Sequence, residues 1–292
     1  MAPCPLSLGW AISLRQMESL GHFELLFRRA LQCLPQEDVA SQRRFRYRDD
    51  SLACILGRLM VRRAMTEMDV KWADVGNRLT RTTRGKPIDV LDELRFNVSH
   101  QGDVVVLAGS SHEEDGEIGV DVMKIDECIE GAKTRVERLR KAFTPRERES
   151  MLKWTTERER WTSFYRHWCL KESVLKATGT GISEDLGALE FRLNDSEDHQ
   201  PGCLITSTVY YQNGNLQKKF AFEESFIGEN HVVAVCRILR GDKPKHRNTG
   251  KDHLFRMVDM DFLLETATVI EPLDDGGAEE FAIFDAKKWK PF

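Results

Sequence analysis

Helical periodicity in the hydrophobic pattern predicts two long helices. Apolar residues between positions 52 and 60 recur on one helix face, which predicts a helix over 51–68, capped by Asp50 or Ser51. A second apolar stripe predicts a helix over 158–178, and Gly179 is placed to end it. Each helix would bury its stripe in a core.

Short apolar runs after each helix predict strands. Positions 94–98 and 104–108 flank a turn at 101–103, which indicates a hairpin. In 118–122 aliphatic residues alternate with Gly119 and Asp121, so Asp121 is predicted on the strand face opposite the aliphatics. Further strands are predicted at 189–193, 205–211, 218–223 and 231–238, with a turn at Asn213-Gly214.

Other signals mark a third helix and the end of the chain. Thr144 is a predicted N-cap, Pro145 the first helical residue, and Glu147 completes a capping box. The polar segment 241–252 is interpreted as a linker, and 255–264 as another strand or helix. The final acidic residues, about 25 in number, predict no particular element.

The order of the elements predicts an α+β protein with two similar halves. Each half has a long helix followed by strands that end in a valine-rich run, at 104–108 and 232–236. This indicates an internal duplication, with two unrelated α+β units as the alternative. We divide the chain into an N-terminal subdomain, a C-terminal subdomain, and a linker with a C-terminal extension, at 1–116, 117–240 and 241–292.

Composition favours a soluble globular protein of the cytoplasm. The 292 residues are 41% hydrophobic and 31% charged, and the net charge of -4 gives no overall attraction to nucleic acid or a membrane. The seven cysteines form no close pairs, which is typical of a reducing compartment. No signal peptide and no apolar stretch of about 18 residues is evident.

One local charge imbalance stands out between Arg43 and Lys86. This window holds twelve basic and five acidic residues, a local charge of +7. Such a patch is often only a solvated face, and it could also bind an anionic ligand or an acidic partner protein. Nucleic acid is the competing partner, but no aromatic-rich basic motif or zinc spacing supports it.

Glu172 is the most unusual acid of the pattern. At 100° per residue it falls within the apolar stripe of helix 158–178, where a carboxylate needs a proton, a cation or a metal. Lys176 lies one turn further on, so an intrahelical ion pair is one interpretation. Asp121 could equally be a solvated surface residue on its strand.

The sequence around these residues resembles the 4'-phosphopantetheinyl transferase superfamily. Gly119-Val120-Asp121 matches its G-[IV]-D segment, and the nine residues 168–176, WCLKESVLK, match its W-x-x-K-E-[AS]-x-x-K segment. The stretches 81–87, 96–103 and 220–224 resemble the longer, surfactin-type branch of the family and its animal cytosolic member. The likeness covers about residues 43–235.

This resemblance implies a fold and a metal site. Family members have a pseudo-twofold α+β fold of two similar halves, with coenzyme A bound in the cleft between them. Asp121 and Glu172 would hold the Mg²⁺ that bridges the pyrophosphate of coenzyme A, since magnesium prefers oxygen ligands. Bacterial relatives carry a third acid where this chain has Met123, so Gln101 or water would supply that ligand.

The resemblance also implies a reaction. Glu172, directly or through a metal-bound water, would take the proton of a carrier-protein serine, which attacks the β-phosphorus of coenzyme A. Lys176 would stabilise the leaving 3',5'-ADP. The expected enzyme is a monomeric, magnesium-dependent holo-[acyl-carrier-protein] synthase that serves carrier domains of a fatty-acid synthase, an aminoadipate-reducing enzyme or similar proteins.

Residue matching further implies a binding site for coenzyme A. Its 3'-phosphate needs fixed cations, and hydrogen-bond donors are expected on the hairpin. His100 could alternatively be a hairpin-end histidine without such a role. The implied coenzyme A residues are Arg48, Arg81, Thr82, Thr83, Arg84, Gly85, Lys86, Asn97, Val98, Ser99, His100, Glu172, Ser173 and Lys176.

Two other functions and two other motifs have weaker support in the sequence. A non-catalytic module that binds coenzyme A or carrier proteins would not need Asp121 and Glu172, and a magnesium phosphohydrolase would need more clustered acids. Gly179-Thr180-Gly181 lies at a helix C-terminus, so it predicts a cap and no phosphate loop. Cys169 lacks a histidine-containing nucleophile pattern, which favours a core thiol.

Overall fold

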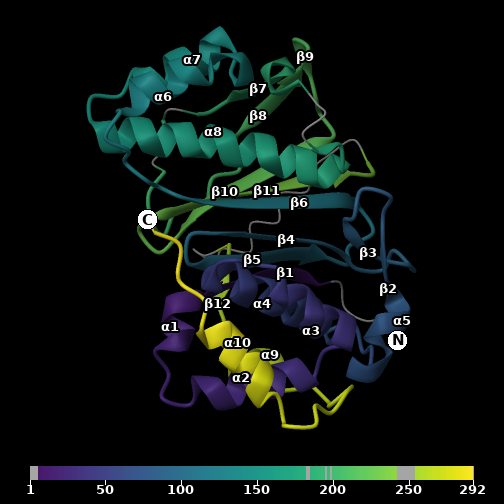
Figure 1. Cartoon of the computed structure of the whole chain (residues 1–292). Coiled ribbons are helices and arrows are strands. Elements are labelled where there is room, and N and C mark those ends of the chain that lie inside the picture. The colour runs from purple at the N-terminus through teal and green to yellow at the C-terminus, as the bar shows by residue number, and fades with distance from the viewer. Residues whose placement is uncertain (1–5, 182–184, 195, 198, 242–253, 292) are drawn as a thin grey trace.

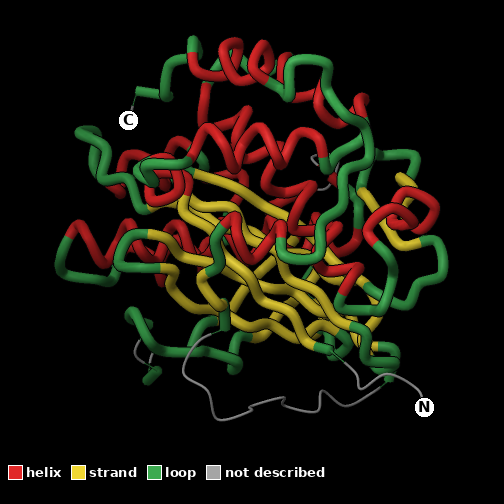
Figure 2. Tube along the Cα trace, turned by 90° about the horizontal axis from the view of Figure 1, so that it is seen from below, coloured by secondary structure: helices red, strands yellow, loops and turns green. Residues whose placement is uncertain are grey.

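Two helix-covered sheets pack face to face in this protein. The computed structural model describes residues 6–181, 185–194, 196–197, 199–241 and 254–291. Figure 1 shows helix α8 on one outer side, then β10, β11 and β6, then β4, β5 and β1, and helix α4 on the other side. Figure 2 shows the strands crossing the middle of the molecule, with helices around them. This mixed helix and sheet architecture confirms the α+β prediction.

The N-terminal half is a sheet in the order β12-β1-β5-β4 with helices on one face. Strands β1, β5 and β4 are antiparallel neighbours, while β12 is parallel to β1. A separate hairpin, β2 with β3, follows the helices. The elements are β1 (Ser7–Ser13), α1 (Leu14–Glu18), α2 (Phe23–Gln32), α3 (Gln36–Arg43), α4 (Arg48–Thr66), the 3₁₀ turn η1 (Trp72–Asp74), α5 (Val75–Arg78), β2 (Leu79–Arg81), β3 (Pro87–Asp89), β4 (Arg95–Gln101) and β5 (Val104–Ser110).

Helix α4 begins one turn earlier than its apolar stripe predicts. The N-cap is Tyr47, so the prediction of Asp50 or Ser51 as the cap was wrong. Asp49 and Asp50 instead occupy the first turn, where their charges complement the helix dipole. The earlier start also has a tertiary cause, because the backbone N–H of Arg48 donates to the carbonyl of Lys288 near the end of the chain, at 2.9 Å.

The C-terminal half places helix α8 over a sheet in the order β10-β11-β6. The capping box at Thr144 and the left-handed Gly179 after α8 confirm both predicted helix signals. The elements are β6 (Asp115–Lys124), α6 (Ala132–Arg138), η2 (Arg140–Ala142), α7 (Pro145–Leu152), α8 (Glu157–Thr178), η4 (Leu186–Ala188), β7 (Leu189–Arg192), β8 (Val209–Gln212), β9 (Asn215–Leu216), β10 (Phe220–Ile227) and β11 (His231–Leu239).

The predicted strand over 205–211 was too long. Only Val209–Gln212 forms β8, while Ile205 makes an isolated bridge to Glu224 on β10. The turn at Asn213-Gly214, with positive φ at both residues, joins β8 to the short β9, not to the strand predicted at 218–223. That segment belongs to β10, which pairs with β11.

The two valine-rich runs are central strands that are buried on both faces. Val105 and Leu107 of β5 face the helices of the N-terminal half, whereas Val104 and Val106 face the other sheet. Strand β11 behaves in the same way against helix α8 and the opposite sheet. Burial on both faces explains why these strands are continuously apolar and not alternating.

The C-terminal extension completes the N-terminal half. After 242–253, where the predicted linker lies outside the described residues, β12 (Arg256–Met257) joins the sheet beside β1. Helices α9 (Met260–Leu264) and α10 (Ala278–Asp285) follow, so 255–264 forms both a strand and a helix. The ring of Phe284 in α10 stacks on Phe27 of α2, with centroids 4.4 Å apart.

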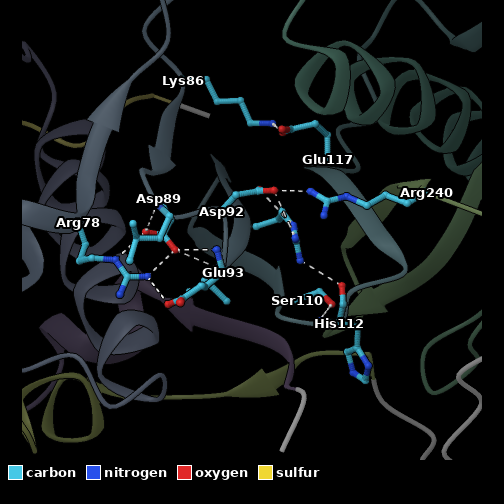
Figure 3. Close-up of polar contacts among 12 residues, drawn as sticks. Arg78, Lys86, Asp89, Asp92, Glu93, Ser110, His112, Glu117 and Arg240 are labelled. Atoms are coloured by element: carbon cyan, nitrogen blue, oxygen red, sulfur yellow. Dashed lines mark hydrogen bonds and ion pairs between the residues drawn. The ribbon is translucent and has the colours of Figure 1, made fainter. Parts of the chain in front are cut away.

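Ion pairs join the two halves at one edge of the sheets. Figure 3 shows Lys86, after β2, pointing toward Glu117 of β6, and the two side chains are 2.6 Å apart. In the same view Asp92 pairs with Arg240, which directly follows β11. These contacts fix the basic hairpin β2–β3 against the C-terminal half.

Candidate active site

Asp121, Lys176 and Ser99 meet where the two halves touch. The ammonium of Lys176 lies 2.6 Å from Asp121 Oδ1 and 2.7 Å from Ser99 Oγ. The Ser99 hydroxyl lies 3.1 Å from the same Asp121 oxygen. Asp121 is only 5% exposed, so it is not the solvated surface residue of the alternative interpretation. Lys176 pairs with this acid and not with Glu172 within its own helix.

Gly119 allows helix α8 to approach strand β6 closely. A Cβ atom at this position would lie 2.0 Å from the carbonyl oxygen of Ser173 and 2.3 Å from the backbone nitrogen of Ala177. No side chain fits there without separating the helix from the strand. The glycine two residues before Asp121 therefore sets the distance between Asp121 and the helix that carries Glu172 and Lys176.

The carboxylates have the properties of a cation site. Asp121 Oδ2 is buried and has no hydrogen-bond partner among the described residues. Burial raises the pKa of Glu172, the nearby charge of Asp121 raises it further, and Lys176 opposes the rise. Two close acids with a buried, unpaired oxygen fit a divalent cation, which prefers carboxylate ligands.

A row of side chains on β4 replaces backbone pairing between the halves. Strands β4 and β6 are edge strands of different sheets. Asn97 Oδ1 accepts the backbone N–H of Val120 at 2.9 Å, and Gln101 Oε1 accepts that of Lys124 at 2.5 Å. Ser99 stands between these two residues and reaches Asp121. The alternation of β4 thus places Ser99 at the site while its neighbours hold β6.

Gln101 or water is the expected source of the third oxygen ligand, because Met123 stands where bacterial relatives carry an acid, two residues after Asp121. Met123 shares its strand face and packs against the core of the C-terminal half. The amide oxygen of Gln101 is engaged with Lys124, as described above. Both observations leave water as the simplest source of further oxygen ligands for a cation at this site.

The basic loop between β2 and β3 covers the C-terminal end of α8. Arg84 Nη1 donates to the carbonyl of Gly179 at 2.8 Å, and Lys86 Nζ lies 3.4 Å from that of Ala177. Cations are favoured at this end of a helix dipole. Thr82 and Lys86 close the loop through their backbones, and Gly85 has φ of +85°. The loop therefore brings its cations to the same helix that carries Glu172 and Lys176.

Five of the implied coenzyme A residues are exposed to solvent. They are Arg81, Thr83, Arg84, Gly85 and His100.

His100 follows Ser99 on β4. Although its side chain is exposed, surrounding protein atoms desolvate the ring and lower the pKa of His100.

Three of the implied residues already have structural contacts. Val98 packs toward α4 with its Cγ1 close to Gly57. The buried hydroxyl of Ser173 donates to the carbonyl of Leu170 at 2.8 Å. The guanidinium of Arg48 pairs with Glu18 and Asp285.

Much of the positive charge between Arg43 and Lys86 is neutralised within the fold. Arg58 pairs with Asp38 at 2.6 Å, and Arg78 pairs with Asp89 at 2.8 Å, as Figure 3 shows for the latter. The count of +7 therefore overstates the charge that this face presents.

The lysine of the W-x-x-K-E segment, Lys171, has a structural position that its sequence does not predict. Lys171 Nζ lies 2.9 Å from Glu147 Oε2 and also donates to the carbonyls of Leu186 and Leu189. Burial lowers the pKa of Lys171 and raises that of Glu147. The capping box identified Glu147 only as a helix-start residue, because its partner is remote in sequence.

Cys169 and the Gly179-Thr180-Gly181 segment have the predicted structural positions. Cys169 is 1% exposed, and burial raises the pKa of its thiol well above the usual range. Gly179 has φ of +66° and ends α8. In the described part of the chain, no group of three or more His, Cys, Asp and Glu residues is arranged to hold a metal. None of its helices is both long and apolar enough to span a bilayer.

Comparisons with known proteins support the motif assignment. Residues 117–236 match the family model of the 4'-phosphopantetheinyl transferase superfamily, and residues 23–112 match the model "4'-phosphopantetheinyl transferase, N-terminal". The chain is 34% identical to the L-aminoadipate-semialdehyde dehydrogenase-phosphopantetheinyl transferase of Mus musculus over 76% of its length and 72% of the relative. For the protein of that name in Homo sapiens the identity is 31%, over 84% and 82% of the two chains. A phosphopantetheinyl transferase of Thraustochytrium is 31% identical over 70% and 69%.

Proposed function

We propose, because the chain belongs to the 4'-phosphopantetheinyl transferase superfamily, that it transfers the 4'-phosphopantetheine group of coenzyme A to a serine of a carrier protein. The observation that carries the proposal is the meeting of Asp121 with Lys176 and Ser99, beside Glu172, at the junction of the halves. Acids and a cation from separate segments converge there, as phosphoryl transfer requires.

The proposed metal is magnesium, held by Asp121 and Glu172. Support comes from the buried, unpartnered Oδ2 of Asp121 and from the proximity of the two acids. When bound, the cation neutralises charge on the pyrophosphate of coenzyme A.

The chain's own residues supply the proton transfer and the fixed charge. Glu172 accepts the proton of the carrier serine, whose oxygen forms a bond to the β-phosphorus. The bond between that phosphorus and the bridging oxygen breaks, and 3',5'-ADP leaves with the electron pair. Lys176, held by Ser99 and Asp121, places an ammonium where the negative charge of the leaving group develops.

Coenzyme A is proposed to lie between the basic loop 82–86 and strand β4. Arg81 and Arg84 are exposed there, and Arg84 is held at the end of the helix that carries Lys176. His100 is exposed on β4, next to Ser99. These groups offer donors to the phosphates of coenzyme A from two directions.

Release of 3',5'-ADP tests this function. The purified protein is incubated with coenzyme A, Mg²⁺ and an apo carrier protein. The release of 3',5'-ADP and the mass of the carrier are both measured. We expect release and carrier modification to occur together and to stop when magnesium is chelated. Binding of coenzyme A with neither event would instead support the non-catalytic module and contradict the proposal.

The finer assignments follow from the same proposal. We expect holo-[acyl-carrier-protein] synthase activity, in a cytoplasmic monomer, on carriers such as a fatty-acid synthase or an aminoadipate-reducing enzyme. A long helix over a sheet in each half, and a doubly buried central strand in each sheet, support an approximate twofold relation of the halves. Labelled coenzyme A in a cell lysate would identify the carriers.

A further inference from the structure

The C-terminal extension is anchored firmly enough to position its last residues. Strand β12 pairs Arg256 with Trp10 and Met257 with Ala11 of β1. Phe284 of α10 is fully buried against the aromatic residues of α2. Burial of such an aromatic side chain stabilises the docked extension. The tail that follows α10 is therefore held at a fixed place on the N-terminal half.

That place is the start of helix α4, next to the candidate site. Tyr47 forms a parallel bridge with Lys288, whose carbonyl accepts the backbone N–H of Arg48. The backbone N–H of Lys290 donates to Asp49 Oδ1 at 3.3 Å, and its ammonium lies 2.6 Å from Asp50 Oδ1. In Figure 1 the yellow ribbon that follows α10 leads up to the level of the junction between the halves.

The same tail orients Arg48. The Arg48 guanidinium lies 2.7 Å from Asp285 Oδ1, and its carbon is 4.7 Å from the ring centre of Phe284. Glu18 pairs with it from the other side. The Nε of Arg48 is buried and has no hydrogen-bond partner in the described chain. Arg48 thus has a fixed position and one unused donor.

His100 lies within the field of these charges. The charged side chains that act on it are Asp49 and Asp50 from α4, Lys176 from α8 and Lys290 from the tail. Its neighbour Ser99 points to Asp121, whereas His100 lies on the alternate face of β4, toward α4. Residues adjacent on one strand thus lead from the Asp121 site to a second group of charged residues, which includes the cations Arg48 and Lys290.

We propose that the C-terminal tail completes the coenzyme A site, with the Lys290 ammonium binding the 3'-phosphate beside Arg48 and His100. This inference rests on the proposed function, because it assumes that coenzyme A is the ligand. The pyrophosphate must lie near Asp121 and Glu172, so the phosphate on the ribose needs separate cations. Lys290 also offsets Asp50, which would otherwise repel an anion.

Binding of two small nucleotides tests the proposal without any turnover. The probe 3',5'-ADP carries the 3'-phosphate, and 5'-AMP lacks it. By calorimetry we expect Lys290→Ala to weaken binding of 3',5'-ADP about tenfold while leaving 5'-AMP unchanged, the size of one lost charge-assisted contact. Lys290→Arg should retain most of the affinity. Lys133→Ala, on the exposed face of α6, is the matched control and should change neither.

Kinetics and a double variant sharpen the result. Lys290→Ala should raise KM for coenzyme A about tenfold with little change in kcat, and should not affect KM for 3'-dephospho-coenzyme A. Its fold should persist, because the ion pair is partly exposed to solvent and contributes little stability. Full recovery of 3',5'-ADP binding in Lys290→Ala/Asp50→Asn would show that Lys290 only neutralises Asp50, and would overturn the proposal.

The two proposals fail in different ways. If the wild-type protein neither binds 3',5'-ADP nor releases it from coenzyme A, the proposed function is wrong. If the wild type does both, and Lys290→Ala leaves the preference for 3',5'-ADP over 5'-AMP unchanged, then only the role of the tail is wrong.

Discussion

Helix α8 carries two lysine–carboxylate pairs five residues apart, and they differ in how completely their atoms are satisfied. Lys171 and Glu147 are 1% and 0% exposed, and the three donors of the ammonium reach Glu147 and two backbone carbonyls. The side chains of Lys176 and Asp121 are 29% and 7% exposed. There, the ammonium of Lys176 donates to Asp121 and Ser99, and one Asp121 oxygen has no partner within the described chain.

This difference distinguishes a structural ion pair from the pair at the proposed active site. Glu147 also accepts hydrogen bonds from the backbone N–H groups of Thr144 and Phe191. Its pair with Lys171 therefore connects α7, α8 and β7, and both Glu147 oxygens have partners. An unsatisfied buried carboxylate oxygen, by contrast, is costly unless a ligand or cation completes it. Two pairs with similar distances therefore predict opposite consequences when they are broken.

We call the site around Asp121, Glu172 and Lys176 the open site, because one Asp121 oxygen has no partner in the described chain. Substitutions in the open site should abolish transfer while preserving the fold. For Asp121→Ala and for Glu172→Ala we expect transfer to fall at least about a thousandfold, which corresponds to about 4 kcal/mol in the barrier. The expected change in melting temperature is small, because Asp121 is buried and Glu172 is partly desolvated, so each substitution removes a carboxylate whose removal from water is itself unfavourable. Release of 3',5'-ADP and thermal unfolding are measured on the same preparations. Wild-type turnover by the Glu172 variant would refute the site assignment.

We call Lys171 and Glu147 the closed pair. Breaking this pair should destabilise the fold. Lys171→Met leaves Glu147 buried without its cation, and we expect the free energy of unfolding at pH 7 to fall by about 3 kcal/mol. Burial raises the pKa of Glu147, so this variant should be least destabilised below pH of about 4.3 and lose stability as the pH rises above it. Chemical denaturation at several pH values measures both effects.

A double variant distinguishes this explanation from a simple loss of packing. Lys171→Met/Glu147→Gln removes the unpaired charge, so it should recover most of the lost stability and its pH dependence should disappear. An equal loss in the single and double variants would show that the ion pair is not the cause. The protein that remains folded should keep its affinity for coenzyme A, because the Lys171 side chain does not contact the proposed coenzyme A site.

The contrast also shows what the sequence can and cannot predict. Local signals identified the capping box at Thr144 and the glycine that ends α8, because each depends on residues within one or two turns. The apolar position of Glu172 correctly indicated a poorly solvated acid. No periodicity could pair Lys171 with Glu147, which lies on another helix.

Long-range contacts explain the other differences. The start of α4 at Arg48 depends on the carbonyl of Lys288, which is remote in sequence. The acidic end of the chain carries too weak a pattern to predict α10, yet Phe284 is fully buried there. At the site, the motif placed Asp121 and Glu172 together, but only the fold shows that Lys176 pairs with Asp121.

A methyl group at Gly119 should disturb the open site more than the closed pair. Gly119→Ala places a Cβ against the backbone of α8 near Ser173 and Ala177, and we expect it to cost about 2 kcal/mol of stability. Since α8 must move away from Asp121, transfer should also fall, while the pair at Lys171 stays closed. Chemical or thermal unfolding measures the loss of stability, and release of 3',5'-ADP measures the loss of transfer. A variant with unchanged kcat would show that this close approach does not set the site geometry.

The smallest expected effect tests whether the open site extends to the basic loop. Arg84 is exposed and held by the carbonyl of Gly179, so Arg84→Ala should leave stability nearly unchanged. We expect KM for coenzyme A to rise about tenfold, because one charge-assisted contact to a phosphate is lost. Arg44→Ala, at another exposed position of the same basic window, is the matched control and should leave KM unchanged. An equal rise of KM in both variants would contradict a specific contact at the end of α8, because that contact would be lost only in the Arg84 variant. It would indicate a general electrostatic attraction by the basic face.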